Sequence, residues 1–233
     1  MTAVAMIGPI TDEQLRVVPA NEASCEDLQA IFGTADAGRC RCQRLQVVGC
    51  FWRDTTQEER NASLRAQTHC GDPGARATSG LVAYVVAPGQ AGEDPPRGDP
   101  AGWVAVQPRT AYPKLRTHRV PWSGRHEDKD DDGVWAVTCF VVRKGYRGRG
   151  LTYPLARAAA VHARSCGARA LEGYPMITQP GKEITWGEVH VGARQVFEDA
   201  GFEEVSRPTV RRVVMRIDFE AGGQPTEHQP TEE

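Results

Sequence analysis

Four basic side chains and three glycines stand within eight positions of this chain, from Arg143 to Gly150. An apolar run, residues 134–142, comes directly before them, and residues 151–166 after them have the pattern of a helix. A buried strand, a tight turn and a helix N-terminus in this order present backbone N–H groups to a phosphate. The stretch therefore predicts a binding site for a phosphorylated cofactor.

The glycine pattern narrows the kind of phosphate ligand. A Walker loop needs Gly-Lys-Ser/Thr, which the turn does not contain. A dinucleotide fingerprint needs a third glycine where Tyr153 stands, although Gly148, Gly150 and the later acidic Glu172 fit it weakly. A pyrophosphate turn of the acyl-CoA type is the third interpretation. The alternative without a cofactor is a solvated basic loop or an RNA-contacting patch.

Acid and base chemistry could come from the segment that follows the predicted helix. Residues 170–174 have the pattern of a strand, and a carboxylate near the end of a buried parallel strand lies where such sheets line ligand crevices. Glu172 is therefore the favoured general base, with an ion pair to an arginine as the competing interpretation. Tyr174 and Tyr153 are candidate acids or packing aromatics. Glu183 and Glu188 are further candidate carboxylates.

The seven cysteines are an odd number scattered through the chain. Cys40, Cys42, Cys50, His69 and Cys70 could supply zinc ligands, but they lack the Cys-x-x-Cys spacing, so we expect no metal. Without an export signal we expect all seven to be reduced thiols. The isolated ones, Cys25, Cys139 and Cys166, are interpreted as small buried apolar residues.

Length and composition bound the class of protein. The 233 residues carry a formal charge of −2, with 40% hydrophobic and 25% charged residues, which suits one soluble domain. Near-neutral charge argues against a nucleic-acid binder, and there is no apolar run long enough to cross a membrane. The N-terminus lacks a basic region and is broken by Gly8-Pro9, so we expect no signal peptide and a cytoplasmic location.

Capping and turn signals outline the other elements. Strands are predicted at 15–18, 81–86, 103–106, 134–142, 170–174, 203–206 and 210–217, the last two forming a hairpin around Pro208. Helices are predicted at 24–32 with Ser24 as cap, from a Thr55–Glu58 capping box towards His69, at 151–166, and at 192–200. Residues 87–100 and 109–133 are predicted to be irregular. Residues 221–233 are predicted to be a disordered acidic tail after a single domain over 1–220.

Two blocks of this sequence resemble the GNAT superfamily of N-acyltransferases. The turn from Arg147 to Leu151 matches the family signature Gln/Arg-x-x-Gly-x-Gly/Ala, with Thr152 at the last position, and the segment ending in Gly201-Phe202 resembles the family's late helix. The resemblance implies an α+β fold with a core over about 80–217. Its central sheet would be mixed, mostly antiparallel, of about six to seven strands, flanked by helices and splayed at two central parallel strands.

The resemblance also implies a cosubstrate, acetyl-CoA, and residues that bind it. Backbone groups of Phe140 to Val142 would bind the pantetheine arm, an N–H near Phe140 would polarise the thioester carbonyl, and the N–H groups of the turn would hold the pyrophosphate. The full expected set is Phe140, Val141, Val142, Arg147, Gly148, Arg149, Gly150, Leu151, Thr152 and Phe197.

The family's catalytic residues match this sequence less completely than its cofactor-binding residues do. Phe197 stands where the family usually has a tyrosine that acts as the general acid, and a phenylalanine cannot donate a proton. His190 stands where the family often has an asparagine that contacts the cofactor. Glu172, Tyr174 and His190 are therefore the candidate catalytic residues, and the segment with Cys40 and Cys42 would wall the acceptor pocket. The expected reaction is acetyl transfer to a primary amine, on a small molecule or a protein, in a ternary complex. The alternative is a degenerate CoA-binding module without turnover. By analogy the chain would form a homodimer and bind neither nucleic acid nor membrane.

Overall fold

The computed structural model describes residues 8–33, 39–49, 52–86, 98–178, 188 and 190–219. They form one seven-stranded sheet in the order β1-β2-β3-β4-β5-β7-β6. Its strands are β1 (Leu15–Pro19), β2 (Gly80–Val86), β3 (Gly98–Pro108), β4 (Val134–Val142), β5 (Ala170–Gly173), β6 (Glu203–Thr209) and β7 (Arg212–Asp218). Only β4 and β5 pair in parallel; the other neighbours are antiparallel. The predicted α+β class and mixed, mostly antiparallel sheet are confirmed.

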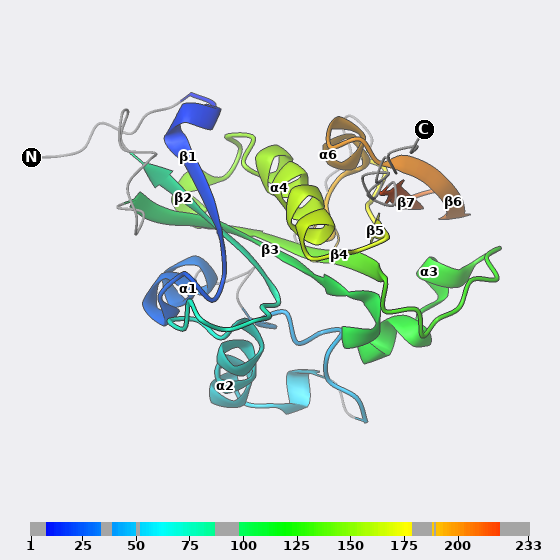
Figure 1. Cartoon of the computed structure of the whole chain (residues 1–233), viewed down its shortest axis with the longest axis horizontal. Coiled ribbons are helices and arrows are strands. Elements are labelled where there is room, and N and C mark those ends of the chain that lie inside the picture. Colours follow the sequence, from blue (N-terminus) through cyan, green and yellow to red (C-terminus); the bar gives the residue numbers. More distant parts are fainter. Residues whose placement is uncertain are drawn as a thin grey trace, which may run out of the picture.

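Helices cover both faces of the sheet (Figure 1). The helices α1 (Cys25–Phe32) and α2 (Gln57–Thr68) lie on one side, and α4 (Thr152–Ser165) and α6 (Arg194–Asp199) lie on the other. The short α3 (Arg119–Trp122) and two 3-10 turns interrupt the stretch that we expected to be irregular. Each face has its own apolar core because β3 and β4 are buried on both sides.

Helix α4 packs closely on the centre of the sheet. Its buried stripe is mostly alanine, with Leu155, Ala156, Ala159 and Ala163 facing the strands. A Cβ added at Gly102 of β3 would lie 2.7 Å from Leu151 Cδ2, so the missing side chain lets the start of the helix approach the strand. This close packing fixes the turn that precedes α4 against the end of β4.

Local signals placed most elements well, with two corrections. The capping box of α2 is formed by Thr56 and Glu59, one residue after the predicted pair: the Glu59 N–H donates to Thr56 Oγ1 at 3.1 Å. Pro208 lies within β6, and the hairpin turns at residues 210–211 instead. The predicted tail at 221–233, the loop at 87–97, Cys50 and Glu183 lie outside the described residues.

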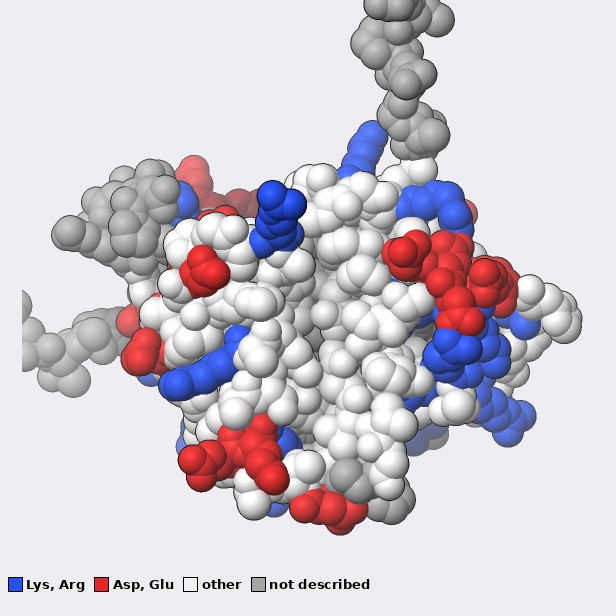
Figure 2. All heavy atoms as spheres, turned by 60° about the horizontal axis from the view of Figure 1, so that its bottom comes forward, with Lys and Arg blue, Asp and Glu red and all other residues white. Residues whose placement is uncertain are grey.

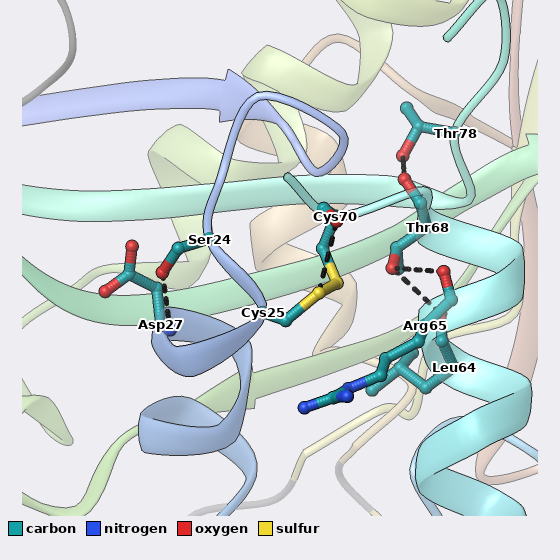
Figure 3. Close-up of a disulfide and its surroundings, with 8 residues drawn as sticks. All are labelled: Ser24, Cys25, Asp27, Leu64, Arg65, Thr68, Cys70 and Thr78. Carbon is teal, nitrogen blue, oxygen red and sulfur yellow. Dashed lines mark hydrogen bonds between the residues drawn. A yellow bond between two sulfur atoms is a disulfide. The ribbon is translucent and has the colours of Figure 1, made fainter. Parts of the chain in front are cut away.

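The expectation that all cysteines are reduced is wrong for two of them. Cys25 at the start of α1 and Cys70 just after α2 form a disulfide with a Cα–Cα distance of 5.1 Å (Figure 3). Ser24 caps α1 by accepting a hydrogen bond from the Asp27 N–H at 3.0 Å, and the Thr68 hydroxyl donates to the Leu64 carbonyl at 2.8 Å. The bond therefore ties together two helix ends on the same face of the sheet, and Cys25 is not an isolated apolar residue. The burial expected for Cys166 is also wrong, because this residue is exposed, whereas Cys139 is buried as expected.

Candidate functional site

The glycine-rich turn has the open backbone that a phosphate site needs. It follows β4 through a 3-10 turn at Lys144–Tyr146, and α4 begins at Thr152. Gly148 and Gly150 have φ values of +72° and +80°, which disfavour side chains, and a Cβ at either would meet nothing within 4 Å. Within the described residues the N–H groups of Arg149 and Gly150 donate to no acceptor. The turn therefore fits a pyrophosphate at the α4 N-terminus.

The arginine side chains of the turn hold its backbone in place. Arg147 Nε donates to the Val142 carbonyl at 3.0 Å, and Arg149 Nε donates to the Gly8 carbonyl at 2.9 Å. The Ile10 N–H returns a hydrogen bond to the Arg149 carbonyl at 3.2 Å. The contact between the N-terminal segment and the turn was not predicted, because no sequence signal links residues so far apart.

Strands β4 and β5 separate before β4 reaches this turn. They pair only over Val134–Val137 and Ala170–Gly173, after which β5 ends and β4 continues to Val142. An irregularity opposite Ala105 and Val106 leaves Thr138 outside the register of β3. The Phe140 N–H donates to the His190 carbonyl at 2.7 Å. The polarising role expected for this N–H remains a prediction, and it requires that hydrogen bond to open.

Four of the residues expected to bind the cofactor have side chains in the cores: Phe140, Val141, Leu151 and Phe197. Phe197 is fully buried and stacks edge-to-face on Phe140, with ring centroids 5.9 Å apart. Its ring occupies the space left by two glycines: a Cβ on Gly173 would lie 2.0 Å from its Cε1. Val141 and Leu151 are buried as well. In this structure Phe197 is a packing residue, and Val141 and Leu151 can offer only backbone groups to a ligand.

Glu172 lies in a buried ion-pair network. Its side chain is fully buried, with the Arg216 guanidinium 2.9 Å and the Arg109 guanidinium 3.3 Å from its oxygens, and Arg125 also in contact. The Tyr174 hydroxyl donates to it at 3.1 Å. All its near neighbours are thus donors. The geometry favours the ion-pair interpretation of Glu172 over the role of general base.

A cavity of about 430 Å³ lies where β4 and β5 part. Thr138 and Cys139 of β4 line it, together with Tyr174, Met176, His190 and Val191 beyond the end of β5. The rest of its wall comes from the segments at 40–45, 115–121 and 211–212 and from Glu188; its polar members are Cys40, Cys42, Arg44, His118, Arg211 and Arg212. The structure thus brings Tyr174, His190, Cys40 and Cys42 to one cavity and leaves Glu172 and Phe197 out of it, while the roles expected for these residues remain predictions.

The Cys40 and Cys139 thiols and the Tyr174 phenol of the cavity are held in their neutral forms. Burial raises the pKa of the Cys40 thiol to about 11. A hydrogen bond with Cys42 and burial raise the pKa of Cys139 well above its usual value. Burial, with the nearby Glu172 carboxylate, raises the pKa of Tyr174. Within the described ranges no cluster of three His, Cys, Asp or Glu side chains could hold a metal ion.

His118, Arg44 and Arg212 are cavity residues that we did not predict. They come from three segments far apart in the sequence, so no local pattern could group them. Figure 2 shows the face of the molecule that lies below the sheet in Figure 1. Its middle is largely uncharged, and acidic and basic side chains lie together near its edges. The described residues on this face therefore form no broad basic surface of the kind that nucleic acid needs.

No helix in the described part of the chain is long and apolar enough to span a membrane. No family model matches the sequence, and no curated protein matches it. Solved structures with a similar fold include the GNAT domain of S. lividans PAT, at 15% identity over 88% of this chain and 89% of that one, with a TM-score of 0.44.

Two more solved structures were found in the same comparison. One is yncA from Salmonella typhimurium, solved with its cofactor acetyl-CoA, at 14% identity over 90% of this chain and 97% of that one, with a TM-score of 0.46. The other is a GCN5-related N-acetyltransferase from Kribbella flavida, at 16% identity over 90% and 100%, with a TM-score of 0.44. The S. lividans and Kribbella flavida proteins belong to the family that the sequence resembles. Their TM-scores lie below 0.5, so these likenesses assign no function to this chain.

Proposed function

We propose that this chain transfers an acetyl group from acetyl-CoA to a primary amine by direct transfer in a ternary complex. One observation carries the proposal: the single strand β4 joins the cavity to the glycine-rich turn. Thr138 and Cys139 of β4 line the cavity, and the turn begins at Arg143, directly after the strand ends. A ligand with a phosphate at one end and a reactive group at the other could therefore lie along this strand.

The turn supplies the binding groups for the phosphate end. The N–H groups of Arg149 and Gly150 would donate to the pyrophosphate, and the α4 N-terminus adds about 0.3–1 kcal/mol for a nearby anion. When bound, acetyl-CoA supplies an acetyl thioester that an amine can attack. The Phe140 N–H now donates to the His190 carbonyl. Once that hydrogen bond opens, the N–H would donate to the carbonyl oxygen of the thioester and polarise it.

The amine must lose a proton before it can attack, and His190 is better placed than Glu172 to take it. Its side chain lines the cavity, whereas Glu172 is enclosed by arginines. A positioned base is typically worth 10²–10⁴-fold in rate. We infer that His190 takes the proton, directly or through a water. Tyr174 holds its proton towards Glu172, so its role is to shape the cavity wall.

The test is an assay of acetyl transfer itself. Purified protein is mixed with acetyl-CoA and a panel of small primary amines, free CoA thiol is followed with a thiol reagent, and acetylated amine is identified by mass spectrometry. We expect amine-dependent thiol release and an acetylated product. His190→Gln should lower kcat by about 10²-fold or more, with His69→Gln, at the end of α2, as the control. Thiol release that no amine accelerates would contradict the proposal.

A second candidate function is a CoA-binding module without turnover. The hydrogen bond between Phe140 and His190 favours it, because the N–H expected to polarise the carbonyl already has an acceptor. Phe197 at the place of the family's acidic tyrosine favours it too. Tight binding of acetyl-CoA without transfer to any amine in the panel would support this function.

A further inference from the structure

The N-terminal segment is bonded to the glycine-rich turn through one residue of the turn, Arg149. The Ile10 N–H donates to the Arg149 carbonyl at 3.2 Å, and Arg149 Nε donates to the Gly8 carbonyl at 2.9 Å. Gly8 precedes Arg149 by 141 positions, so this is a tertiary contact and not a local feature of the turn. The backbone and the side chain of Arg149 are thus both held by residues 8–10.

The segment has anchors of its own on the body of the domain. Ile10 is half-buried and packs against the apolar core that includes Leu155 of α4. Asp12 Oδ1 lies 3.5 Å from Arg157 Nη2, also on α4, and the chain then enters β1 at the edge of the sheet (Figure 1). The position of the Ile10 N–H is therefore set by the core and the sheet as well as by the turn.

The hydrogen bond from Ile10 fixes the direction of one peptide group. The Arg149 carbonyl and the Gly150 N–H belong to the same planar trans peptide group, so they point in opposite directions. Because the carbonyl points towards Ile10, the N–H points away from the N-terminal segment, and it donates to no acceptor among the described residues. A hydrogen bond at the carbonyl also polarises the group and strengthens its N–H as a donor.

The glycine after this peptide group would let it turn over if nothing held it. Gly150 has a φ of +80°, and glycine adopts positive and negative φ about equally readily. Turned over, the group would present the Arg149 carbonyl oxygen where the Gly150 N–H now points. A phosphate is bound by N–H groups and repelled by a carbonyl oxygen, so the site needs the orientation that Ile10 holds.

We propose that Ile10 is a positioning residue for the cofactor: its N–H holds the Arg149–Gly150 peptide group with the Gly150 N–H directed at the pyrophosphate. Gly8 assists by accepting the hydrogen bond from the Arg149 side chain. The inference rests on the ligand of the proposed function, acetyl-CoA, and adds the N-terminal segment to its binding site. It requires binding of acetyl-CoA but not its turnover.

Removing the Ile10 N–H tests the inference. Ile10→Pro lacks the donor, and Ile10→Ala, the matched control, loses the side chain but keeps the N–H. Acetyl-CoA is titrated into each variant by calorimetry, and thermal unfolding shows that each is folded. We expect Ile10→Pro to bind acetyl-CoA about three- to tenfold more weakly than Ile10→Ala, which is the effect of losing one hydrogen bond.

A second ligand, S-acetylpantetheine, separates positioning from a general effect on the fold. It carries the same thioester as acetyl-CoA but no pyrophosphate. Its affinity should be the same in Ile10→Pro and Ile10→Ala, because it offers the Gly150 N–H no phosphate. In the transfer assay, the KM for acetyl-CoA should rise in Ile10→Pro while kcat and the KM for the amine stay unchanged.

A second pair of variants tests the same contact through side chains, and it carries the test if Ile10→Pro does not fold. Arg149→Met removes the hydrogen bond to Gly8. Lys144→Met, the matched control, removes the same charge from an exposed position in the same turn. We expect Arg149→Met to bind acetyl-CoA at least about threefold more weakly than Lys144→Met.

The outcomes separate the inference from the proposed function. Equal affinities of Ile10→Pro and Ile10→Ala for acetyl-CoA would overturn the inference and leave acetyl transfer standing. Weaker binding in Ile10→Pro, in a protein that acetylates no amine, would support the inference and contradict acetyl transfer. Equal losses of affinity for acetyl-CoA and S-acetylpantetheine would show a general structural role and overturn the positioning role of Ile10.

Discussion

Replacing Glu172 by glutamine distinguishes its two interpretations. The carboxylate is fully buried and contacts three guanidinium groups, with Arg216 at 2.9 Å and Arg109 at 3.3 Å. Removing one partner of a buried ion pair costs about 3–5 kcal/mol, because the other charge stays buried. Glu127 also contacts these arginines, so we take the lower end, about 3 kcal/mol. For a chain of this length that lowers Tm by about 6–12 °C.

The assay is unfolding by urea, followed by tryptophan fluorescence, beside acetyl transfer measured well below both melting temperatures. Glu127→Gln is the control, since Glu127 joins the same arginines but is 40% exposed. An exposed pair contributes about 0–1 kcal/mol, so this variant should cost little stability. A cost under about 1 kcal/mol in Glu172→Gln, together with a fall in transfer of about 10²–10⁴-fold, would instead identify Glu172 as a general base and contradict the ion-pair interpretation.

Three more predictions follow from the packing. Reduction of the Cys25–Cys70 disulfide, which spans 45 residues, should lower the free energy of unfolding by about 2–4 kcal/mol. Denaturation with and without reductant measures this loss, and the control Cys166→Ser should cause no such loss. Burial lowers the pKa of His162 below 6.5, so its contribution to stability is complete above pH 6.5 and is lost as the pH falls through its lowered pKa; His162→Gln should flatten that decline in denaturation midpoints from pH 7 to 5. Gly173→Ala should cost about 1–3 kcal/mol by driving a Cβ into the Phe197 ring, and calorimetry should show a cost less than additive with Phe197→Ala.

Local signals in the sequence were sufficient for the strand, turn and helix around the glycines. The apolar run of β4, the two glycines with positive φ and the start of α4 all depend on neighbours in the chain, so pattern and spacing predicted them. The cap at Ser24 is equally local. The α2 cap was misplaced by one residue because Thr55 and Thr56 each have a glutamate three positions later.

Contacts between distant segments could not be predicted in the same way. The disulfide joins cysteines 45 residues apart, and nothing in the sequence says which two of seven meet. Glu172 has the pattern of a residue at a ligand crevice, but its arginine partners come from two loops and β7. Arg212 reaches the cavity only because the β6–β7 hairpin folds back beside β5. Each of these contacts depends on how distant segments are arranged in space, which one sequence does not reveal.

The central claim is that the turn before α4 binds the pyrophosphate of acetyl-CoA. Calorimetric titration of acetyl-CoA into the unmodified protein, Gly150→Glu and Gly167→Glu tests it directly. Gly167 is the matched control, because it lies at the other end of α4 with φ +82° and the same open space. A glutamate charge about 4 Å from one phosphate charge costs about 4 kcal/mol near a surface. We predict micromolar binding to the unmodified protein and to Gly167→Glu, and a loss of about 10³-fold in Gly150→Glu. Equal binding to all three, or none to the unmodified protein, would contradict the claim.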